Sequence, residues 1–413
     1  MPNFLLERST PVATGLGVAT AFGFGVDSFR TALYSPSPIF KTMQRPGRQL
    51  PGGRSAFVGA EIPEVRDPLP PRISRTTGLT GRVTVAVVQE AWRDAGLDDV
   101  DPDQIGLIIG GSNVQTREQL LLQDVQTEKL RFLSPQLGYR FMDTDLCGLC
   151  TSVFPIRGFA YAVGAASASG LLAIQHAAAA VQVGRVQACI AVGALQDLSY
   201  VELQALRSLG AMGSDRFAEM PDQACRPFDR DRDGFIFGEC SAAIVFRRLD
   251  QVNRSAGIYG AITGSAHVAD GNRGPEPSLS GEVRAIRRAI GQAGLRPEDV
   301  DYVNAHGTGS PAGDDTEVAA FRESGLVNAR INATKSIVGH GLSAAGAVEL
   351  AAVFLQMRDQ RLHATRNLDH PIAPELLWMG REPESVGFRN ALKVSFGFGG
   401  IDTAVVVQPV QGR

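Results

Sequence analysis

Apolar residues along this chain gather in short continuous runs that alternate with amphipathic or alanine-rich stretches. Such runs predict buried strands. One starts at residue 12 and runs into a glycine-rich turn within 12–20, and the others fall at 105–111, 188–193, 242–246, 300–304 and 391–395. The helical spacing of apolar positions predicts a helix over 83–95, and Ala-rich stretches predict buried helices over about 161–183 and 337–357. Strands that alternate with helices are typical of α/β domains. We therefore predict an α/β fold.

The second half of the chain repeats the element order of the first half. Residues 91–112 and 289–310 both read as a helix end, an Ala-Gly-Leu turn, an acidic turn, a buried strand and a glycine-rich end. The two Ala-rich helices form another matching pair. Such a repeat implies two stacked, pseudo-symmetric halves whose helix ends can converge on one interior site. We place the halves at residues 1–250 and 251–413, with an irregular, partly helical insertion near 116–156.

Length, charge and composition narrow the possible functions. With 413 residues, 44% of them hydrophobic, the chain has enough material for more than one ordinary core. The formal net charge is −3 and no basic block is present, which argues against nucleic-acid binding. No run is apolar and long enough to span a membrane, and the segment that starts at Met1 does not read as a signal peptide. We expect a cytoplasmic protein.

Three features resemble binding motifs but lack parts that those motifs need. Cys147 and Cys150 form a lone C-x-x-C with no second pair and no nearby histidine, so we interpret them as structural and expect no metal site. Gly15 and Gly17, expected in a turn that follows the first strand, lack the third glycine and the acidic residue of a dinucleotide-binding fingerprint. The Asp/Arg-rich segment 226–239 reads as a charge-paired turn rather than a calcium loop. No resident cofactor is expected.

Ser167 stands among small residues at the start of the first Ala-rich helix. Small side chains there let another backbone or a ligand approach closely. The free N–H groups and the positive dipole end of such a helix favour a developing negative charge. The alternative is that Ser167 only caps the helix. This stretch alone leaves both interpretations open.

Three glycine-rich junctions carry further candidate residues. His306 opens His-Gly-Thr-Gly-Ser after a predicted strand, and Lys335 and His340 flank the short segment before the second Ala-rich helix. Phe396 and Phe398 alternate with glycines after the last predicted strand. Sites in α/β proteins are usually built where strands end and helices begin. These junctions are therefore the places where we expect a site.

Together these segments resemble the β-ketoacyl-acyl-carrier-protein synthases of the thiolase fold. The resemblance covers essentially the whole chain and rests on Ala-Ser167-Ala-Ser-Gly, Arg226-Pro-Phe-Asp…Gly238-Glu, His306-Gly-Thr-Gly-Ser, Lys335-Ser-Ile-Val-Gly-His340 and Phe396-Gly-Phe-Gly-Gly400, in family order. It implies a homodimer of five-layered αβαβα subunits. It also implies a buried site that the phosphopantetheine arm of an acyl carrier protein enters with the substrate.

The family's catalytic set is Cys-His-His with a supporting lysine. By resemblance, the histidines are His306 and His340, the lysine is Lys335, and Phe398 gates the pocket. Backbone N–H groups of Ser167 and Phe398 are the expected oxyanion hole. The nucleophilic cysteine of the family is matched by Ser167, which is the main departure. Cys240, Ile401 and Asp402 also stand where the family usually has other residues.

A serine at this position separates two chemistries. A helix end and a histidine can turn a thiol into a thiolate nucleophile, but a serine hydroxyl is far less acidic and would need a positioned base. Loss of CO₂ from a malonyl thioester needs only donors aimed at the thioester oxygen, which two histidines can supply. The sequence therefore predicts decarboxylation of malonyl-acyl carrier protein to acetyl-acyl carrier protein.

This pattern resembles the free-standing decarboxylating ketosynthase variants of polyketide β-branching cassettes, which carry serine here. In those systems the acetyl-carrier product feeds an enzyme similar to hydroxymethylglutaryl-CoA synthase. Two alternatives stay open. One is a condensing synthase, with Ser167 either natural or an engineered replacement of cysteine. The other is a non-catalytic partner like the chain-length factors, although His306 and His340 are both retained.

Overall fold

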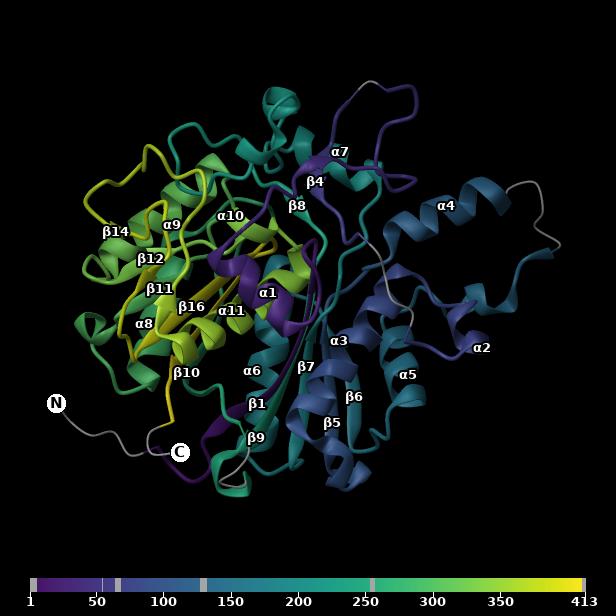
Figure 1. Ribbon diagram of the computed structural model, residues 1–413, viewed down its shortest axis with the longest axis horizontal. Coiled ribbons are helices and arrows are strands. Elements are labelled where there is room, and N and C mark those ends of the chain that lie inside the picture. Colours follow the sequence, from purple (N-terminus) through teal and green to yellow (C-terminus); the bar gives the residue numbers. More distant parts are fainter. Residues whose placement is uncertain (1–5, 54, 64–67, 127–131, 253–256, 411–413) are drawn as a thin grey trace.

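A long mixed sheet forms the frame of the molecule (Figure 1). The computed structural model describes all residues except 1–5, 54, 64–67, 127–131, 253–256 and 411–413. The strand order is β14 (Leu377–Trp378), β12 (Arg330–Asn332), β11 (Tyr302–Asn304), β16 (Ala391–Gly397), β17 (Ile401–Gln408), β10 (Gly260–Ala269), β1 (Pro11–Thr20), β9 (Ser241–Arg248), β7 (Ala188–Gly193), β5 (Ile105–Gly110) and β6 (Phe159–Val163).

The two halves of this sheet have the same pairing pattern. In the order β1-β9-β7-β5-β6 the first two contacts are antiparallel and the next two parallel. The order β10-β17-β16-β11-β12 follows the same pattern. Strands β1 and β10 join the halves through the antiparallel pairs Val12–Ala261 and Ala13–Gly260. The pseudo-symmetry expected from the sequence repeat is present in this pairing, and the division at residue 250 stays a prediction.

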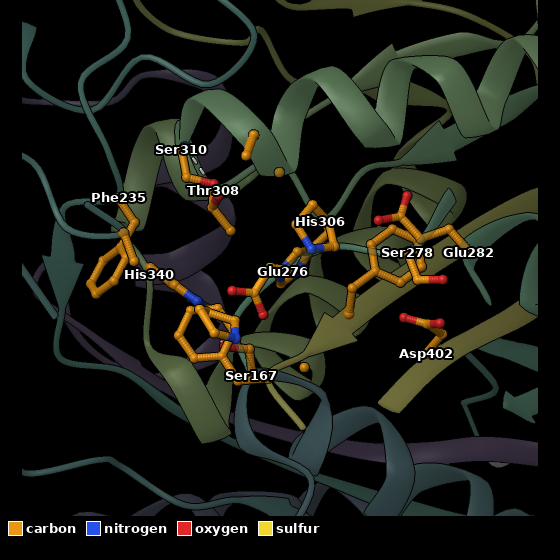
Figure 2. Close-up of a pocket in the computed structure, with 18 of the residues that line it drawn as sticks. Ser167, Phe235, Glu276, Ser278, Glu282, His306, Thr308, Ser310, His340 and Asp402 are labelled. Atoms are coloured by element: carbon orange, nitrogen blue, oxygen red, sulfur yellow. Dashed lines mark hydrogen bonds between the residues drawn. The ribbon is translucent and has the colours of Figure 1, made fainter. Parts of the chain in front are cut away.

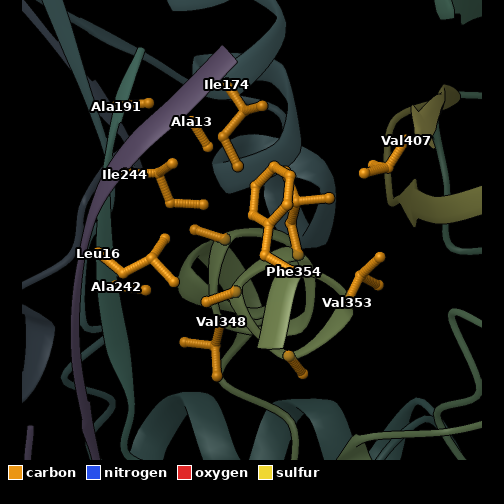
Figure 3. Packing of buried hydrophobic residues seen from close by; sticks show 14 of the residues in the cluster. Ala13, Leu16, Ile174, Ala191, Ala242, Ile244, Val348, Val353, Phe354 and Val407 are labelled. Atoms are coloured by element: carbon orange, nitrogen blue, oxygen red, sulfur yellow. The ribbon is translucent and has the colours of Figure 1, made fainter. Parts of the chain in front are cut away.

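Helices fill three layers around the two half-sheets. The central layer holds α6 (Ser169–Gln182) and α11 (Ala345–Asp359), and every residue of α11 from Ala345 to Met357 is buried. In the cluster of Figure 3, Ile174 and Phe354 of these helices pack between Leu16 of one half-sheet and Val407 of the other.

The outer faces are covered by a second set of helices. On the first half these are α3 (Leu79–Ala95) and α5 (Thr144–Val153), and on the second half α8 (Leu279–Gln292) and α9 (Pro311–Glu323). The result is the predicted five-layered αβαβα arrangement.

The central helices cross where glycines permit backbone contact. A Cβ added to Gly170 would lie 2.9 Å from the backbone of Ser343 and Ala347, and one added to Gly346 would lie 2.7 Å from Leu171 N. Side chains at either position would push the helices apart. Because both glycines lie in the first turn of their helices, the two N-terminal ends meet in the interior.

Two predicted elements were wrong. Strand β1 continues through Gly15 and Gly17, which were expected in a turn. These glycines make room for α3, since a Cβ on Gly17 would lie 2.0 Å from Val87 O. The predicted helix over 161–183 is also too long, because β6 occupies Phe159–Val163 and α6 begins only at Ser169.

The remaining elements are short or peripheral. They are α1 (Val26–Tyr34), α2 (Pro71–Ser74), α4 (Thr116–Gln126), α7 (Tyr200–Ser208), α10 (Lys335–Val338), β2 (Gly23–Phe24), β3 (Lys41–Thr42), β4 (Val58–Ala60), β8 (Phe237–Gly238), β13 (Arg361–Leu362) and β15 (Glu384–Ser385). The insertion predicted at 116–156 contains α4 and α5, while its residues 127–131 lie outside the described chain. In the part of the chain that the structure describes, no helix is long and apolar enough to cross a bilayer.

Candidate active site

A cavity of about 290 Å³ opens where the ends of α6 and α11 meet (Figure 2). Its lining includes Ser167, His306, His340 and Phe398, which come from four separate segments of the sequence. The structure thus brings together the residues expected to form a site. Lys335 lies behind this lining and contacts His306.

Ser167 lies in a 3₁₀ turn, Ala166–Ala168, that precedes α6. Ala166 adopts φ 44°, a left-handed conformation that is costly for a residue other than glycine. The N-cap residue of α6 is Ala168, and no side chain caps the helix. The alternative that Ser167 serves only as a helix cap is therefore wrong. Its Oγ instead lies 3.0 Å from Nε2 of His340.

His340 is held by its own backbone and by the 3₁₀ turn Leu342–Ala344, which precedes α11. Its N–H donates to Ile236 O at 2.7 Å, and its carbonyl accepts from Gly238 N at 3.2 Å. The N–H of Leu342 donates to its Nδ1 at 3.3 Å. Burial, followed by the charge of Lys335, lowers the pKa of His340 well below its ordinary value. A neutral ring that accepts at Nδ1 carries its proton on Nε2.

This tautomer decides what His340 does to Ser167. Nε2–H donates a hydrogen bond to the serine oxygen, so the ring cannot also take the serine proton through that nitrogen. The pair therefore lacks the base that activates a serine nucleophile. What the ring offers the cavity is a fixed N–H donor.

His306 offers a second donor of the same kind. Nζ of Lys335 lies 3.3 Å from Nδ1 of His306, and the same ammonium also donates to the carbonyl of His306. Burial, then the charge of Lys335, holds the pKa of His306 well below its ordinary value, so the ring is neutral and its proton lies on Nε2. The two histidine rings stand 5.7 Å apart, nearly perpendicular.

Lys335 belongs to a buried ion network that motif analysis missed. Glu349 of α11 accepts from Lys335 at 2.5 Å and pairs with Lys393 of β16 at 2.7 Å, and all three side chains are fully buried. The network fixes the ammonium against His306. A sequence signal existed, because Glu349 and Lys393 are charged residues inside segments predicted to be buried, and buried charges need partners.

Two acidic residues of α9 fix the loop that carries His306. Glu317 accepts from the backbone N–H groups of His306 and Gly307 at 2.6 and 2.8 Å. Asp314 accepts from Gly309 N at 3.1 Å and from Phe228 N at 2.7 Å. Both acids follow the His-Gly-Thr-Gly-Ser motif in the sequence, but nothing in the motif itself indicated their role.

Phe398 lies in the turn between β16 and β17, and its side chain is 42% exposed at the cavity. Gly397 touches the serine turn so closely that a Cβ there would lie 2.3 Å from Ala165 O. This contact places the Phe398 loop against Ser167. The gating role of Phe398 and the oxyanion hole with Ser167 stay predictions. Among the described residues, no group of three or more metal-ligating side chains is arranged to hold an ion.

Comparison with known proteins identifies the family. Residues 12–252 match the β-ketoacyl synthase N-terminal domain, and residues 259–369 match the β-ketoacyl synthase C-terminal domain. The chain belongs to the β-ketoacyl synthase family. This β-ketoacyl synthase homologue has the thiolase fold expected from its motifs. It aligns with the crystal structure of a β-ketoacyl synthase from Burkholderia phymatum STM815 at a TM-score of 0.85 and 26% identity, covering 97% of this chain and 100% of the other.

Two curated β-ketoacyl synthase relatives align over almost their whole length. The polyketide biosynthesis malonyl-ACP decarboxylase PksF of Bacillus subtilis (strain 168) is 48% identical over 403 residues, which is 97% of this chain and 96% of the relative. The 3-oxoacyl-[acyl-carrier-protein] synthase 2 of Mycobacterium leprae (strain TN) is 32% identical over 419 residues, 98% of each chain. The first relative is thus clearly more similar than the second.

Proposed function

We propose that this protein decarboxylates malonyl-acyl carrier protein to acetyl-acyl carrier protein. The observation that carries the proposal is the pair of neutral imidazoles, His306 and His340, that both carry their proton on Nε2 at one cavity. The similarity to PksF, whose name states this activity, supports it independently.

The reaction needs stabilisation of one developing charge. When the bond between the malonyl α-carbon and its carboxylate breaks, CO₂ leaves and the electron pair forms an enolate whose charge lies on the thioester oxygen. Donors already aimed at that oxygen stabilise it without reorganisation. His306 and His340 are the donors in this proposal, and the thioester oxygen replaces Oγ of Ser167 as the acceptor of the His340 N–H when the substrate binds. Each well-placed donor of this type contributes about 3–4 kcal/mol to the barrier reduction.

Lys335 keeps the donors in the required state. Its ammonium occupies Nδ1 of His306, and its charge disfavours protonation of both rings. A protonated ring would also bind the malonyl carboxylate before CO₂ leaves, which would stabilise the ground state as well as the transition state. A neutral ring instead stabilises the transition state more than the bound malonyl group.

Ser167 has no base, and this separates decarboxylation from condensation. Because Nε2–H of His340 donates to its oxygen, the hydroxyl stays protonated and does not accept an acyl chain efficiently. In the proposal the phosphopantetheine arm delivers the malonyl group directly to the cavity, and no acyl-enzyme is needed.

The decisive experiment follows the mass of the loaded carrier arm. Malonyl-loaded carrier protein is incubated with the enzyme, and intact-mass analysis is combined with measurement of released CO₂. The proposal predicts conversion to the acetyl form, with unmodified Ser167. A rate of CO₂ release equal to that of the carrier protein alone would contradict it.

The wider assignment adds a partner enzyme and a setting. The acetyl-carrier product would pass to an enzyme similar to hydroxymethylglutaryl-CoA synthase in polyketide β-branching, in the cytoplasm. The similarity to a polyketide biosynthesis enzyme supports this setting. Mixing the purified reaction with such a synthase and a β-ketoacyl-carrier acceptor should move the acetyl group onto the acceptor.

The assembly in this proposal is a homodimer. Strand β6 ends the strand order and, within the described part of the chain, pairs with β5 alone. Its residues Phe159, Tyr161 and Val163 are apolar or aromatic and half-buried. Exposed edge strands normally carry charged side chains or are covered by another segment. A second copy paired along β6 would cover this edge. Sedimentation equilibrium should show a dimer that Ala160→Arg weakens, and a monomeric wild type would contradict the dimer.

A further inference from the structure

The proposed reaction consumes one proton whose source the histidines do not explain. After CO₂ leaves, the α-carbon of the enolate must gain a proton to become a methyl group. In the proposal, the N–H groups of His306 and His340 bind the oxygen, and both rings resist a second proton because of burial. Lys335 is already bonded to Glu349 and His306. Another group must supply the proton.

Two buried carboxyl groups line the same cavity. Glu282 of α8 is 1% exposed and Asp402 of β17 is 3% exposed, yet both contribute to the cavity lining. Figure 2 shows both carboxyl groups on one side of His306, with Ser167 on the other side. Oε2 of Glu282 and Oδ2 of Asp402 have no hydrogen-bond partner among the described residues. Unpartnered buried oxygens in an open cavity are unusual and point to a function.

The two groups are neighbours across the packing of α8 on β17. Oδ2 of Asp402 lies so close to Gly281 that a Cβ there would be 2.1 Å away, and Glu282 is the next residue. The same added Cβ would lie 2.7 Å from Cβ of Asp270. A carboxylate placed among other carboxylates and removed from water is held in its protonated form.

The charged groups around the pair are mostly acidic. Asp270, which follows β10, acts on both groups, while the charges of Asp314 and Glu317 of α9 act on Glu282. Arg284 of α8 is a cation that acts on Asp402, and its guanidinium donates to backbone carbonyls. Burial first, then Glu317, raises the pKa of Glu282 well above its ordinary value, and burial with Asp270 raises the pKa of Asp402 to about 7.

We propose that Glu282 and Asp402 form a carboxyl pair that supplies the proton consumed when the enolate becomes acetyl. The inference rests on the proposed function. The carboxyl O–H bond breaks as a C–H bond forms at the α-carbon with the electron pair left by CO₂, so the carboxyl group itself delivers the proton. The carboxylate regains its proton from bulk water through the cavity opening, so atoms and charges balance. General acids of this kind contribute about 10²–10⁴-fold in rate.

The test measures which hydrogen isotope reaches the product. Malonyl-carrier protein is decarboxylated in an equal mixture of H₂O and D₂O, and mass spectrometry gives the ratio of CH₃ to CH₂D in the acetyl product. Carboxyl groups and water discriminate differently between the isotopes, so the ratio reports the donor. The mass of recovered, unreacted malonyl-carrier protein is also measured. It corrects for deuterium that enters the malonyl α-carbon before CO₂ is lost. The variants are Glu282→Gln, Asp402→Asn and both together.

If the pair is the donor, the double variant should give a changed isotope ratio and should form acetyl-carrier protein about 10²-fold more slowly. Glu276→Gln, at an exposed carboxylate that also lines the cavity, is the matched control and should keep the wild-type ratio. Because a variant can fail to fold, the wild type is also measured at pH 6 and pH 9. Its ratio should move at pH 9 toward that of the double variant, as the pair loses its proton.

Each outcome separates the two proposals. If the wild type forms no acetyl-carrier protein, the proposed function fails before any ratio exists. If the wild type is active but its ratio is the same at both pH values, and the same in every folded variant, water is the donor and only the carboxyl pair is overturned.

Discussion

The two helix starts that meet at the cavity have nearly the same backbone but different chemistry. Ala166 and Leu342 adopt φ 44° and 51°, and each opens a 3₁₀ turn that leads into a central helix. The next residue in both turns is a serine, Ser167 in the first half and Ser343 in the second. The fold therefore places two hydroxyl groups at corresponding positions.

Their partners differ. The hydroxyl of Ser343 donates to Ala194 O at 2.8 Å, and this buried hydrogen bond is structural. Oγ of Ser167 faces Nε2 of His340 at the cavity. Two residues before each strained turn, the first half has Gly164 and the second half has His340. A symmetric scaffold thus gains an asymmetric site, because one half supplies the hydroxyl and the other supplies the imidazoles.

The largest effect is expected at the histidines. His306→Ala and His340→Ala each remove one donor to the enolate oxygen, so decarboxylation should fall about 10²–10³-fold per variant. Steady-state rates with malonyl-carrier protein measure this. His267→Ala, on an exposed position of β10, is the control and should stay near the wild-type rate. Near-wild-type activity in both cavity variants would remove the histidines from the mechanism.

Ser167→Cys should convert the first helix start into a nucleophile. A thiol beside a helix N-terminus ionises far more readily than a hydroxyl. Incubation with an acyl-loaded carrier protein should then produce an acyl-enzyme, visible as added mass, that the wild type does not form. Ser343→Cys is the matched control, since that position faces a backbone carbonyl. Equal acylation of wild type and Ser167→Cys would show that Ser167 is already activated.

A smaller effect separates the two serines by stability. Ser343→Ala leaves Ala194 O without its buried donor, and the free energy of unfolding should fall by about 1–3 kcal/mol. Ser167→Ala removes a group that lines a cavity and should cost less than about 1 kcal/mol. Denaturant unfolding of both variants measures the difference. A larger loss for Ser167→Ala would mean that its hydroxyl is mainly structural.

The smallest effect concerns another corresponding pair, Ser241 of β9 and Asp402 of β17, which pair with Ala19 and Val268 in equivalent registers. Burial raises the pKa of Asp402 from 3.8 to about 7, so the folded state holds a proton that the unfolded chain releases. Its contribution to stability is present below about pH 4 and is lost as the pH rises to 7.

Asp402→Asn should remove that loss. The difference in Tm between variant and wild type should therefore shift in favour of the variant between pH 4 and pH 8, as differential scanning calorimetry can measure. Glu282 contributes a loss of the same sign in both proteins, and this loss cancels from the difference. A constant difference in Tm across this range would show that Asp402 is ionised in the folded protein.

Local patterns predicted most of the scaffold. Continuous apolar runs marked β5, β7 and β16, and the repeated element order indicated two halves, because burial and periodicity are properties of adjacent residues. They failed at β1 and β6. Gly17 in β1 is required by the backbone of α3, which is a contact between distant segments. The short half-exposed strand β6 has no continuous apolar signal that distinguishes it from the helix after it.

The site was predicted in the same uneven way. The start of the first Ala-rich helix gave Ser167, and the glycine-rich junctions gave His306, Lys335 and His340. The fold brings these residues together. The tautomers of the histidines could not be predicted, because they depend on the N–H of Leu342 and on the ammonium of Lys335 in three dimensions. Glu317, which holds the His306 loop, and the buried Glu282 lie on outer helices. No sequence motif describes how those helices pack.

The most direct test offers the enzyme both reactions at once. Malonyl-carrier protein and a second carrier loaded with an acyl chain are mixed with the wild-type protein, and intact masses of both carriers and of the enzyme are followed over time. The account predicts that acetyl-carrier protein accumulates, while the second chain keeps its length and Ser167 stays unmodified. Efficient extension of that chain through an ester at Ser167 would contradict the account.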